Sequence, residues 1–219
     1  GSVRLGPFRF SFLTSVLDEM DYHISDIDYS RSGRARRYVS AHRLDARFLK
    51  GRLQCAVTEL VIYGGDSRNL EWVFLNPLMF FHAAQMNNIS TANTMGTVDL
   101  LFYPFPEWEL YGSLLIDDVQ VEKKIPGDLE PNEIGTVIGT RWADPFKLSG
   151  LTLSGEYTRV TNRTYKTPKP FETFVRFNIP LGHPLGNDFD LLKFDVSQWI
   201  RGDLLFEVGY GVLRKGEGS

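Results

Sequence analysis

The stretch of residues 108–121, WELYGSLLIDDVQV, constrains the fold more than any other part of the chain. When it is read with a period of two, one face is apolar, whereas the other carries hydroxyls and a carboxylate. The apolar face consists of Leu110, Gly112, Leu114 and Ile116. This alternation is typical of a β-strand with two unlike faces. The stretch therefore predicts a sheet that belongs to a soluble sandwich, a carboxylate enzyme or a membrane barrel with a polar lumen.

Similar alternation recurs along the chain, separated by turns rich in Gly, Pro and Asp. We expect strands at residues 3–16, 37–49, 53–63, 94–103, 108–121, 133–142, 151–160, 171–179, 191–196 and 204–213. Many evenly spaced strands with turn signals between them indicate a sandwich or a barrel. We predict an all-β fold, an antiparallel up-and-down β-barrel of the membrane type with about ten or more strands, as a single domain over residues 1–219.

Two segments depart from the alternation. Residues 70–86 are rich in aromatic side chains, and we predict a short helical or irregular insert near residues 76–86, with Asn76 as its cap and Pro77 at its first position. Residues 31–37, RSGRARR, read as a turn whose basic side chains are solvated. The alternative for these basic residues is a patch for an anionic ligand at the mouth of a barrel.

The composition excludes several classes of protein. The 24 basic against 27 acidic residues give a net charge of −3, which argues against a nucleic-acid binder. No run approaches the ~18 apolar residues of a transmembrane helix, but the strands of a membrane barrel need only ~10 alternating residues each. The single Cys55 excludes an intrachain disulfide and a cysteine zinc cluster. We expect a monomer.

Charged residues in the middle of predicted strands lie at positions whose alternate neighbours are mainly apolar or small. They are Arg43, Asp45, Arg47, Glu59, Asp99, Asp117, Arg141, Glu156, Arg176, Lys193, Asp195 and Glu207. Acids and bases are interleaved, as expected where each desolvated charge needs a partner. We therefore predict a charge ladder inside a lumen and an outward apolar row facing lipid. Solvent-facing charges on a soluble β-sandwich that binds carbohydrate are the alternative.

Aromatic residues near the predicted strand ends support the membrane reading, because membrane barrels carry aromatic girdles at both interfaces. They are Tyr103, Trp108, Trp142, Tyr157, Trp199 and Tyr210.

A set of short motifs in a fixed order resembles the capsule assembly protein Wzi family of Gram-negative outer membranes. The motifs are HRL (42–44), TELVIYG (58–64), NPLMFFH (76–82), LYGSLLIDDVQ (110–120), GTRWADPF (139–146), GEYTRV (155–160) and PLGHPLG (180–186). The resemblance implies an outer-membrane β-barrel that works as a lectin for capsular or related surface polysaccharide, and it does not imply catalysis. Because members of that family are longer and have more strands, we expect a partial chain.

An enzyme built on this sequence would use carboxylates. The alternative to a binding protein is a polysaccharide hydrolase that uses Glu59 with Asp117 or Glu156, since a glycosidase needs two carboxyl groups flanking the sugar. We favour pairing of these acids with Arg43, Arg141 and Arg176 inside the barrel, and we predict no catalytic residue. Because Asp117 and Asp118 are adjacent on a strand and point to opposite faces, and the four histidines share no ligand spacing, we predict no metal and no cofactor.

Sugar binding uses aromatic faces that stack on pyranose rings and planar polar groups that bond hydroxyls. Candidate ligand-binding residues lie in the predicted insert and near loops: Trp72, Phe80, Phe81, His82, Tyr165 and Trp199. Packing within the girdle or the insert is the alternative role for these side chains.

Overall fold

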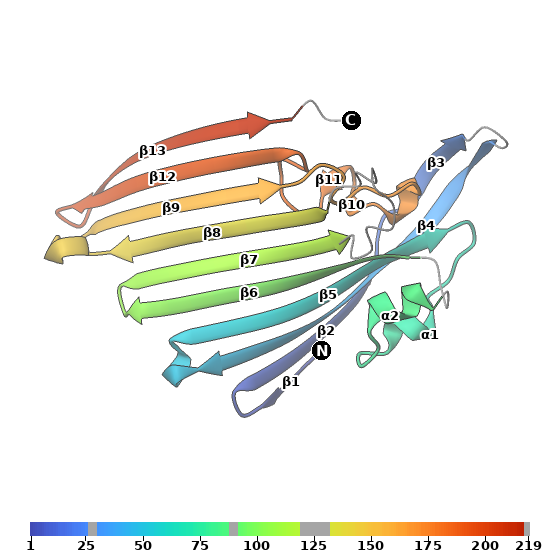
Figure 1. Ribbon diagram of the computed structural model, residues 1–219, viewed down its shortest axis with the longest axis horizontal. Helices are drawn as coiled ribbons and strands as arrows, with labels where there is room; N and C mark the ends of the chain where they lie inside the picture. The colour runs from blue at the N-terminus through green and yellow to red at the C-terminus, as the bar shows by residue number, and fades with distance from the viewer. Residues whose placement is uncertain (26–29, 88–91, 119–131, 217–219) are drawn as a thin grey trace, which may run out of the picture. The chain divides into compact units, whose positions relative to one another are not determined.

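The computed structural model describes residues 1–25, 30–87, 92–118 and 132–216, and strands dominate the described chain (Figure 1). The strands are β1 (Ser2–Leu5), β2 (Phe8–Val16), β3 (Met20–Ser25), β4 (Ser30–Phe48), β5 (Leu53–Gly65), β6 (Asn93–Phe105), β7 (Trp108–Asp118), β8 (Glu133–Ala143), β9 (Leu151–Val160), β10 (Val175–Arg176), β11 (Ile179–Pro180), β12 (Phe189–Ile200) and β13 (Leu204–Lys215). The helices are α1 (Trp72–Leu75) and α2 (Phe81–Met86), with 3₁₀ turns η1 (Leu49–Gly51), η2 (Pro145–Lys147) and η3 (Pro170–Glu172).

The large sheet has eleven strands that pair in the order β1-β2-β4-β5-β6-β7-β8-β9-β12-β13, with β3 on β4. Strands β10 and β11 form a sheet of their own, and every pair with a defined register is antiparallel. The all-β antiparallel prediction is confirmed. One large sheet does not fit the sandwich alternative, which needs two sheets packed face to face. Among the described residues the order is open between β1 and β13, so closure into a barrel stays a prediction.

The structure differs from three of the predicted elements, at residues 3–16, 31–37 and 171–179. Residues 3–16 form two strands, because Gly6 at φ +58° and Pro7 close a two-residue turn between Leu5 and Phe8. Residues 171–179 do not form one strand. They begin in η3 and continue through β10 to a turn at Phe177 and Asn178, which both have positive φ.

The third wrong prediction is the solvated basic turn at residues 31–37, which is part of β4. Strand β3 pairs with it, and the register sets Asp21 opposite Arg34. Arg34 also lies 2.7 Å from Glu19. Opposite charges across a strand pair stabilise the pairing, so the charges that hide the alternation in the sequence help to hold this hairpin together.

The chain divides into two compact units, which we describe separately. Unit 1 comprises Gly1–Leu44, Val57–Gly96 and Tyr165–Gly186, and unit 2 comprises Asp45–Ala56, Thr97–Thr164 and Asn187–Ser219. The long strands β4, β5 and β6 contribute residues to both. The prediction of a single domain stays a prediction.

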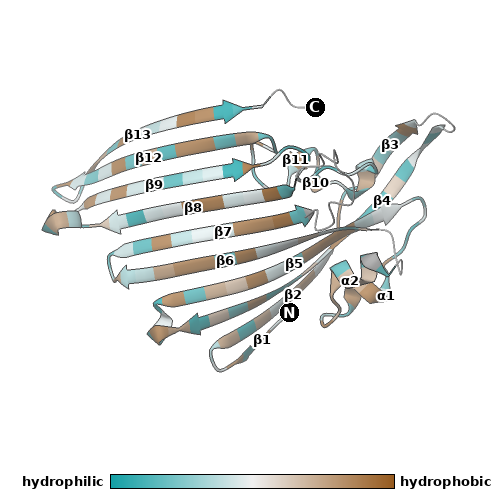
Figure 2. Ribbon diagram, in the orientation of Figure 1, coloured by the Kyte–Doolittle hydropathy of each residue, from teal (hydrophilic) through white to brown (hydrophobic). Residues whose placement is uncertain are grey.

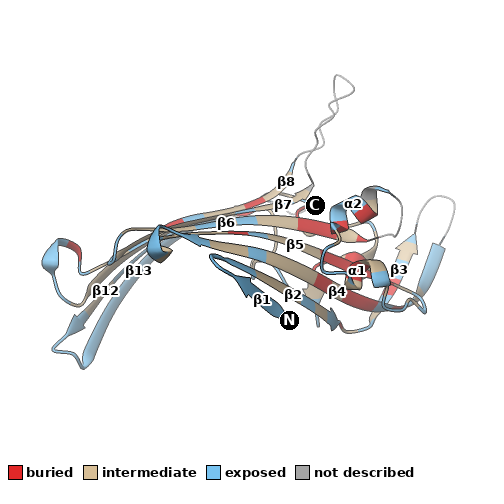
Figure 3. Cartoon of the chain, turned by 90° about the horizontal axis from the view of Figure 1, so that it is seen from below, coloured by how far each residue is buried: buried red, intermediate tan, exposed pale blue. Residues whose placement is uncertain are grey.

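In unit 1 the helical insert covers one face of β4 and β5, which we call the insert face. Buried residues gather there beside α1 and α2 (Figure 3). The core consists of Tyr38, Val61, Tyr63, Phe74, Phe81, Ala84 and Ala92. Tyr63 stacks on Tyr38 with ring centroids 5.3 Å apart, and its ring also contacts Phe74 at 4.5 Å. Burial of these large rings fixes the insert on the sheet.

The insert was expected near residues 76–86, but its internal boundaries differ. Asn76 does not cap a helix that starts at Pro77. It ends α1, and its Oδ1 accepts the backbone N–H of Leu78 at 3.0 Å in a turn. Helix α2 begins four residues later than predicted, at Phe81.

The opposite face of unit 1 holds residues 165–186 through one arginine. Arg37 is fully buried, and its Nε donates to the carbonyl of Phe171 at 2.9 Å. Its Nη2 donates to the carbonyls of Thr173 at 2.6 Å and Val175 at 2.9 Å, and its Nη1 lies 3.6 Å from Asp18. A single side chain from the basic run therefore fixes the η3–β10 segment on the sheet.

Unit 2 is a run of antiparallel strands whose register defines two unlike faces. Apolar and polar residues are interleaved along β6 to β13 (Figure 2). Directly paired residues share a face, so Ile138, Tyr157, Leu192 and Val212 form one continuous row across β8, β9, β12 and β13. We call this side the apolar face. The other side, the polar face, carries Arg141, Glu156, Lys193 and Asp195.

Candidate functional site

The apolar face of unit 2 carries large exposed apolar side chains on β7, β8, β12 and β13. They are Leu114, Ile116, Ile138, Leu192, Phe194, Val196, Leu204, Phe206, Val208, Tyr210 and Val212. A contiguous apolar surface of this extent marks contact with a protein, a ligand or a membrane.

An aromatic cluster lies at one end of this face. The rings of Trp108 and Trp142 are 5.7 Å apart, and Phe105 and Phe146 extend the cluster at 6.3 Å and 5.1 Å. The Trp108 indole N–H donates to Thr140 at 2.8 Å. Trp108 and Trp142 thus fit an interfacial girdle. The other predicted girdle residues are spread differently: Tyr157 and Tyr210 lie mid-strand on the apolar face, while Tyr103 and Trp199 lie on the polar side.

The polar face of unit 2 is a network of paired groups. The register sets Glu109 opposite Arg141 and Glu156 opposite Lys193. The Tyr111 hydroxyl donates to Glu156 at 2.7 Å. Opposite charges at directly paired positions stabilise a sheet, so these carboxylates have structural partners.

Tyr111 reaches Glu156 by crossing a whole strand. It lies on β7, its partner Gly139 lies on β8, and Gly139 in turn pairs with Glu156 on β9. A Cβ atom on Gly139 would stand 2.2 Å from the Tyr111 ring. Glycine at this position is therefore what allows the tyrosine to span β8 and to bond the carboxylate beyond it.

Glu59 of unit 1 has partners that the sequence did not reveal. Its carboxylate accepts the backbone N–H groups of Phe81 at 2.9 Å and His82 at 2.8 Å, at the start of α2. His42 Nε2 donates to the same carboxylate at 2.9 Å. A carboxylate on a mostly apolar face needs such donors, and the insert supplies them.

The predicted ladder partner of Glu59 is wrong. Arg43 lies on the opposite side of β4 from His42 and donates to Thr58 Oγ1 at 3.0 Å, whereas Glu59 lies on the insert face. Adjacent residues of a strand point to opposite faces, so Glu59 does not join the row of Arg43, Asp45 and Arg47.

Arg176 does not join the ladder either. It belongs to β10 of the small sheet, and its guanidinium lies 5.3 Å from the Phe177 ring.

Four further ladder residues of unit 2 share the polar face with Glu156: Asp99, Lys193, Asp195 and Glu207. Asp99 accepts the Ser113 hydroxyl at 2.6 Å, and Glu207 pairs with Ser197 beside Asp195. Asp117 sits at an irregularity in the β7–β8 register, between Ile116 and Asp118. Whether this face lines a lumen depends on closure of the sheet and stays a prediction.

Two of the three carboxylates of the hydrolase alternative, Glu59 and Glu156, accept hydrogen bonds from neighbouring groups. Glu59 lies in unit 1, where it caps α2, whereas Asp117 and Glu156 lie in unit 2, and Glu156 is bonded by Tyr111. No cluster of metal-ligating side chains occurs among the described residues. These hydrogen bonds give Glu59 and Glu156 structural roles.

The predicted sugar-binding residues fall in different surroundings. Trp72 is 85% exposed and Phe80 is 73% exposed, and His82 is exposed beside Thr94. Trp199 is half-exposed at the end of β12, and Tyr165 is partly buried at φ +71°. Phe81 is fully buried in the core of unit 1. A glycan can reach the exposed rings of Trp72, Phe80, His82 and Trp199 and the partly exposed ring of Tyr165, but not the ring of Phe81.

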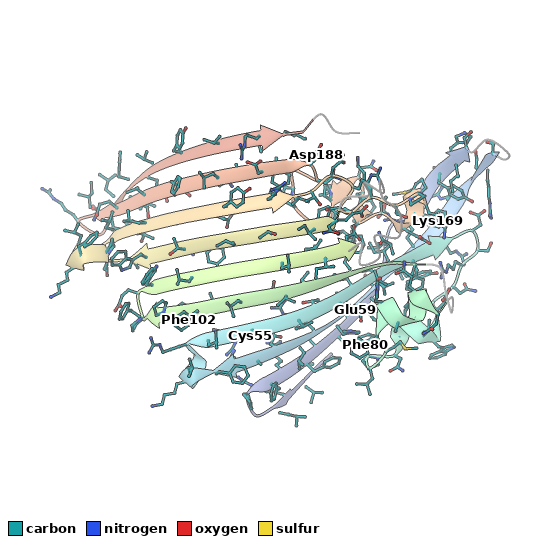
Figure 4. The ribbon with its side chains drawn as sticks, viewed as in Figure 1. Cys55, Glu59, Phe80, Phe102, Lys169 and Asp188 are labelled. Carbon is teal, nitrogen blue, oxygen red and sulfur yellow. The ribbon has the colours of Figure 1, made fainter. Side chains whose placement is uncertain are left out.

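A groove in unit 1 was not foreseen from the sequence. It has a volume of about 530 Å³ and runs between the insert and the insert face. Residues 77–80 of the insert form its roof. Its floor is formed by residues of the strands: Phe10, His42, Leu44, Val57, Thr58, Glu59 and Gly96. Glu59 of β5 and Phe80 of the insert, both labelled in Figure 4, are among its lining residues. The signal in the sequence was Gly96, a glycine where the strand alternation calls for a side chain.

These features define an all-β antiparallel protein with an apolar face, a paired polar face and a helical insert. The model of the family described as capsule assembly protein Wzi matches residues 2–219, and the chain belongs to this family. The resemblance noted from the motifs is confirmed. Wzi proteins are a family of outer-membrane capsule assembly proteins and not of enzymes.

No curated protein and no solved structure is detectably similar to the chain. None of the helices in the described residues is long and apolar enough to cross a membrane.

Proposed function

We propose that this protein resides in the outer membrane of a Gram-negative bacterium, exposes its apolar face to lipid, and binds capsular or related surface polysaccharide without cleaving it. The observation that carries the proposal is the family match over residues 2–219. The exposed apolar face of unit 2 supports the membrane location, since such a surface is unfavourable in water.

Binding of polysaccharide is supported by exposed aromatic side chains beside polar groups. Trp199 stands on the polar side at the end of β12, in the same row as Ser197, and Tyr165 is partly exposed in the loop that follows β9. Flat rings beside hydrogen-bonding groups suit a pyranose, which has an apolar face and a rim of hydroxyls. Trp72 and His82 of the insert remain further candidates.

The test is binding of the detergent-extracted protein to immobilised capsular polysaccharide. We expect Trp199→Ala and Tyr165→Ala each to weaken binding about tenfold, since aromatic anchors commonly contribute more than 1 kcal/mol. Trp142→Ala, a tryptophan on the apolar face, is the matched control and should bind like the wild type. Equal binding by all three variants would contradict the assignment of these rings.

The polysaccharide hydrolase remains the second candidate, and it makes a different prediction. It would release reducing ends from capsular polysaccharide and would lose that activity in Glu59→Gln. We expect no release from the wild type, because Glu59 is held by His42 and α2. Release that depends on Glu59 would replace the binding function with catalysis.

A further inference from the structure

We propose that the groove between the helical insert and the insert face of unit 1 holds an acyl chain of a membrane phospholipid. The proposal rests on the outer-membrane location proposed above and adds a specific lipid site to it. Its basis is the groove of about 530 Å³, a size typical of small-ligand sites.

The groove is lined mainly by apolar side chains, with His42, Thr58 and Glu59 as its polar members. Leu44 and Val57 form its floor, and Leu78, Met79 and Phe80 form its roof. Several of these are far more exposed than side chains of their size usually are: Leu78 is 82% and Val57 is 56% exposed. Covering these side chains with hydrocarbon would be favourable at roughly 25 cal/mol per Å² of apolar surface.

The floor has space because one of its residues lacks a side chain. A Cβ atom on Gly96 would meet only the Thr58 carbonyl, at 3.9 Å, so the volume above this glycine is open. A bulky residue at this position would fill the groove. The backbone there permits one, since Gly96 has no positive φ.

The charged residues of the groove favour a phospholipid acyl chain over the phosphate-rich headgroup of lipopolysaccharide. Its lining residues include no Lys or Arg, and its carboxylate, Glu59, is bonded to His42 and to the N–H groups of α2. A headgroup rich in phosphate, as in lipopolysaccharide, would find no cation here. A neutral acyl chain, with a zwitterionic phospholipid headgroup at the rim, meets no unpaired charge.

The insert face continues the apolar character of its strands. On β4, Leu44 follows His42 on the same side, and on β5, Val57 precedes Glu59 on the same side. An acyl chain in the groove would therefore lie against apolar side chains of both β4 and β5. The exposed insert side chains Trp72 and Phe80 suit the interfacial region of a bilayer.

The experiment is photolabelling of the protein in vesicles of phosphatidylethanolamine and phosphatidylcholine that contain a phospholipid with a diazirine in its acyl chain. Labelled residues are then identified by mass spectrometry of peptides. We expect label on residues 77–80 and on Val57, and also on the apolar face at Leu114 and Ile138. In Gly96→Leu the label on residues 77–80 should fall about tenfold, whereas Leu114 and Ile138 stay labelled.

Gly112→Leu is the matched control, because it adds the same side chain to the apolar face outside the groove, where a Cβ meets only Val137 O at 3.5 Å. It should leave the label on residues 77–80 unchanged. Leu78→Asp is the second variant, and its change at a site that is 82% exposed should not affect folding. It should also lower groove labelling, since a carboxylate disfavours an acyl chain.

The outcomes separate this proposal from the function on which it rests. Label on Leu114 and Ile138 without label in the groove, or groove label unchanged by both variants, overturns the acyl-chain site alone. Absence of label on both surfaces overturns the membrane location. Loss of groove label on adding lipopolysaccharide or capsular polysaccharide, but not on adding unlabelled phospholipid, overturns phospholipid as the occupant.

Discussion

Arg37 shows how one residue of a charged run can be set apart from its neighbours. Arg31, Arg34 and Arg36 are largely exposed and contact surface acids or Asn69, whereas the side chain of Arg37 is 0% exposed. Arginine has five donors in a planar fork, so it can bond several carbonyls at once. Its bonds to Phe171, Thr173 and Val175 use that capacity.

We predict that Arg37→Met destabilises unit 1 by roughly 3 to 5 kcal/mol, the usual cost of breaking a buried ionic contact by removing one partner. The loss would leave three carbonyls without their donor and Asp18 without its counter-ion. Urea titration gives the free energy of unfolding, and limited proteolysis should show faster cleavage within residues 165–186. Arg36→Met is the control, and equal stability of the two variants would contradict the role of Arg37.

Glu172 provides a test that depends on pH. It is buried in η3 with Lys169 Nζ at 3.5 Å, and burial raises the pKa of its carboxyl despite the opposing effects of Lys169 and Arg68. Because the folded-state pKa is above the unfolded value, the contribution of Glu172 to stability is fully present below about pH 4 and is lost as the pH rises through the folded pKa.

We therefore expect Glu172→Gln to flatten the pH dependence of stability above about pH 4, and to be at least as stable as the wild type at pH 7. The measurement is the free energy of unfolding at a series of pH values. Glu71→Gln, on the partly exposed partner of Arg68, is the control. A Glu172→Gln profile parallel to that of the wild type would mean that this carboxyl titrates as it does in the unfolded chain.

At the scale of single residues, the sequence shows which side chains are charged, but it does not show which groups contact them. It showed that Glu59 was a lone charge in an apolar run, but the donors of Glu59 come from His42 on β4 and from the start of α2, both distant in the sequence. Likewise, nothing local distinguishes Arg37 from Arg36. Burial of a polar group is decided by packing between distant segments, and a single sequence does not contain that information directly.

At the scale of elements, β7, β8 and β9 are connected by a side chain that crosses a strand. Tyr111 lies over Gly139 and bonds Glu156, so three strands share one contact. Glycine usually weakens a strand interior, and a close approach by another group explains its presence here.

We predict that Gly139→Ala and Tyr111→Phe each destabilise unit 2, the second by about 1.5 to 3 kcal/mol because it removes a hydrogen bond to a charged group. A double-mutant cycle gives the coupling. Gly139→Ala should lower the free energy of unfolding much less in a Tyr111→Ala background, because no tyrosine ring then lies above residue 139. Gly112→Ala serves as the control. Additive effects of the two substitutions on stability would contradict the placement of the Tyr111 side chain over Gly139.

The capping of α2 is the second test at this scale. Glu59→Gln should cost about 1 to 2 kcal/mol, since a neutral amide replaces a carboxylate that accepts from two N–H groups and from His42. Thermal unfolding followed by circular dichroism measures the loss. Glu107→Gln, at an exposed position, is a control that also removes a carboxylate. A Glu59→Gln melting temperature equal to that of the wild type would mean that α2 does not depend on this contact.

Strands with strict alternation were predictable, and the others were not. Residues 151–160 were predicted with the boundaries of β9, because apolar and polar residues alternate there and turn residues flank them. The β3–β4 hairpin was missed because its pairing depends on opposite charges rather than on an apolar face. The groove was missed because its roof and its floor come from different segments.

At the scale of the whole molecule, the chain has an apolar face and a paired polar face, and it belongs to the Wzi family. The family and the all-β fold could be predicted from ordered motifs and from alternation. Closure into a barrel could not be tested in this way, because it depends on which strands lie beside β1 and β13. The central claim is that the two faces of unit 2 meet different surroundings, lipid on one side and water or glycan on the other.

The most direct test is the accessibility of single cysteines along β12 in a Cys55→Ala background. Phe194 and Val196 lie on the apolar face, while Asp195 and Ser197 lie on the polar face. With the protein in phospholipid vesicles, a membrane-impermeant maleimide should label Asp195→Cys and Ser197→Cys rapidly. Phe194→Cys and Val196→Cys should stay protected until the protein is denatured. Equal labelling at all four positions would place both faces in water and would contradict the account.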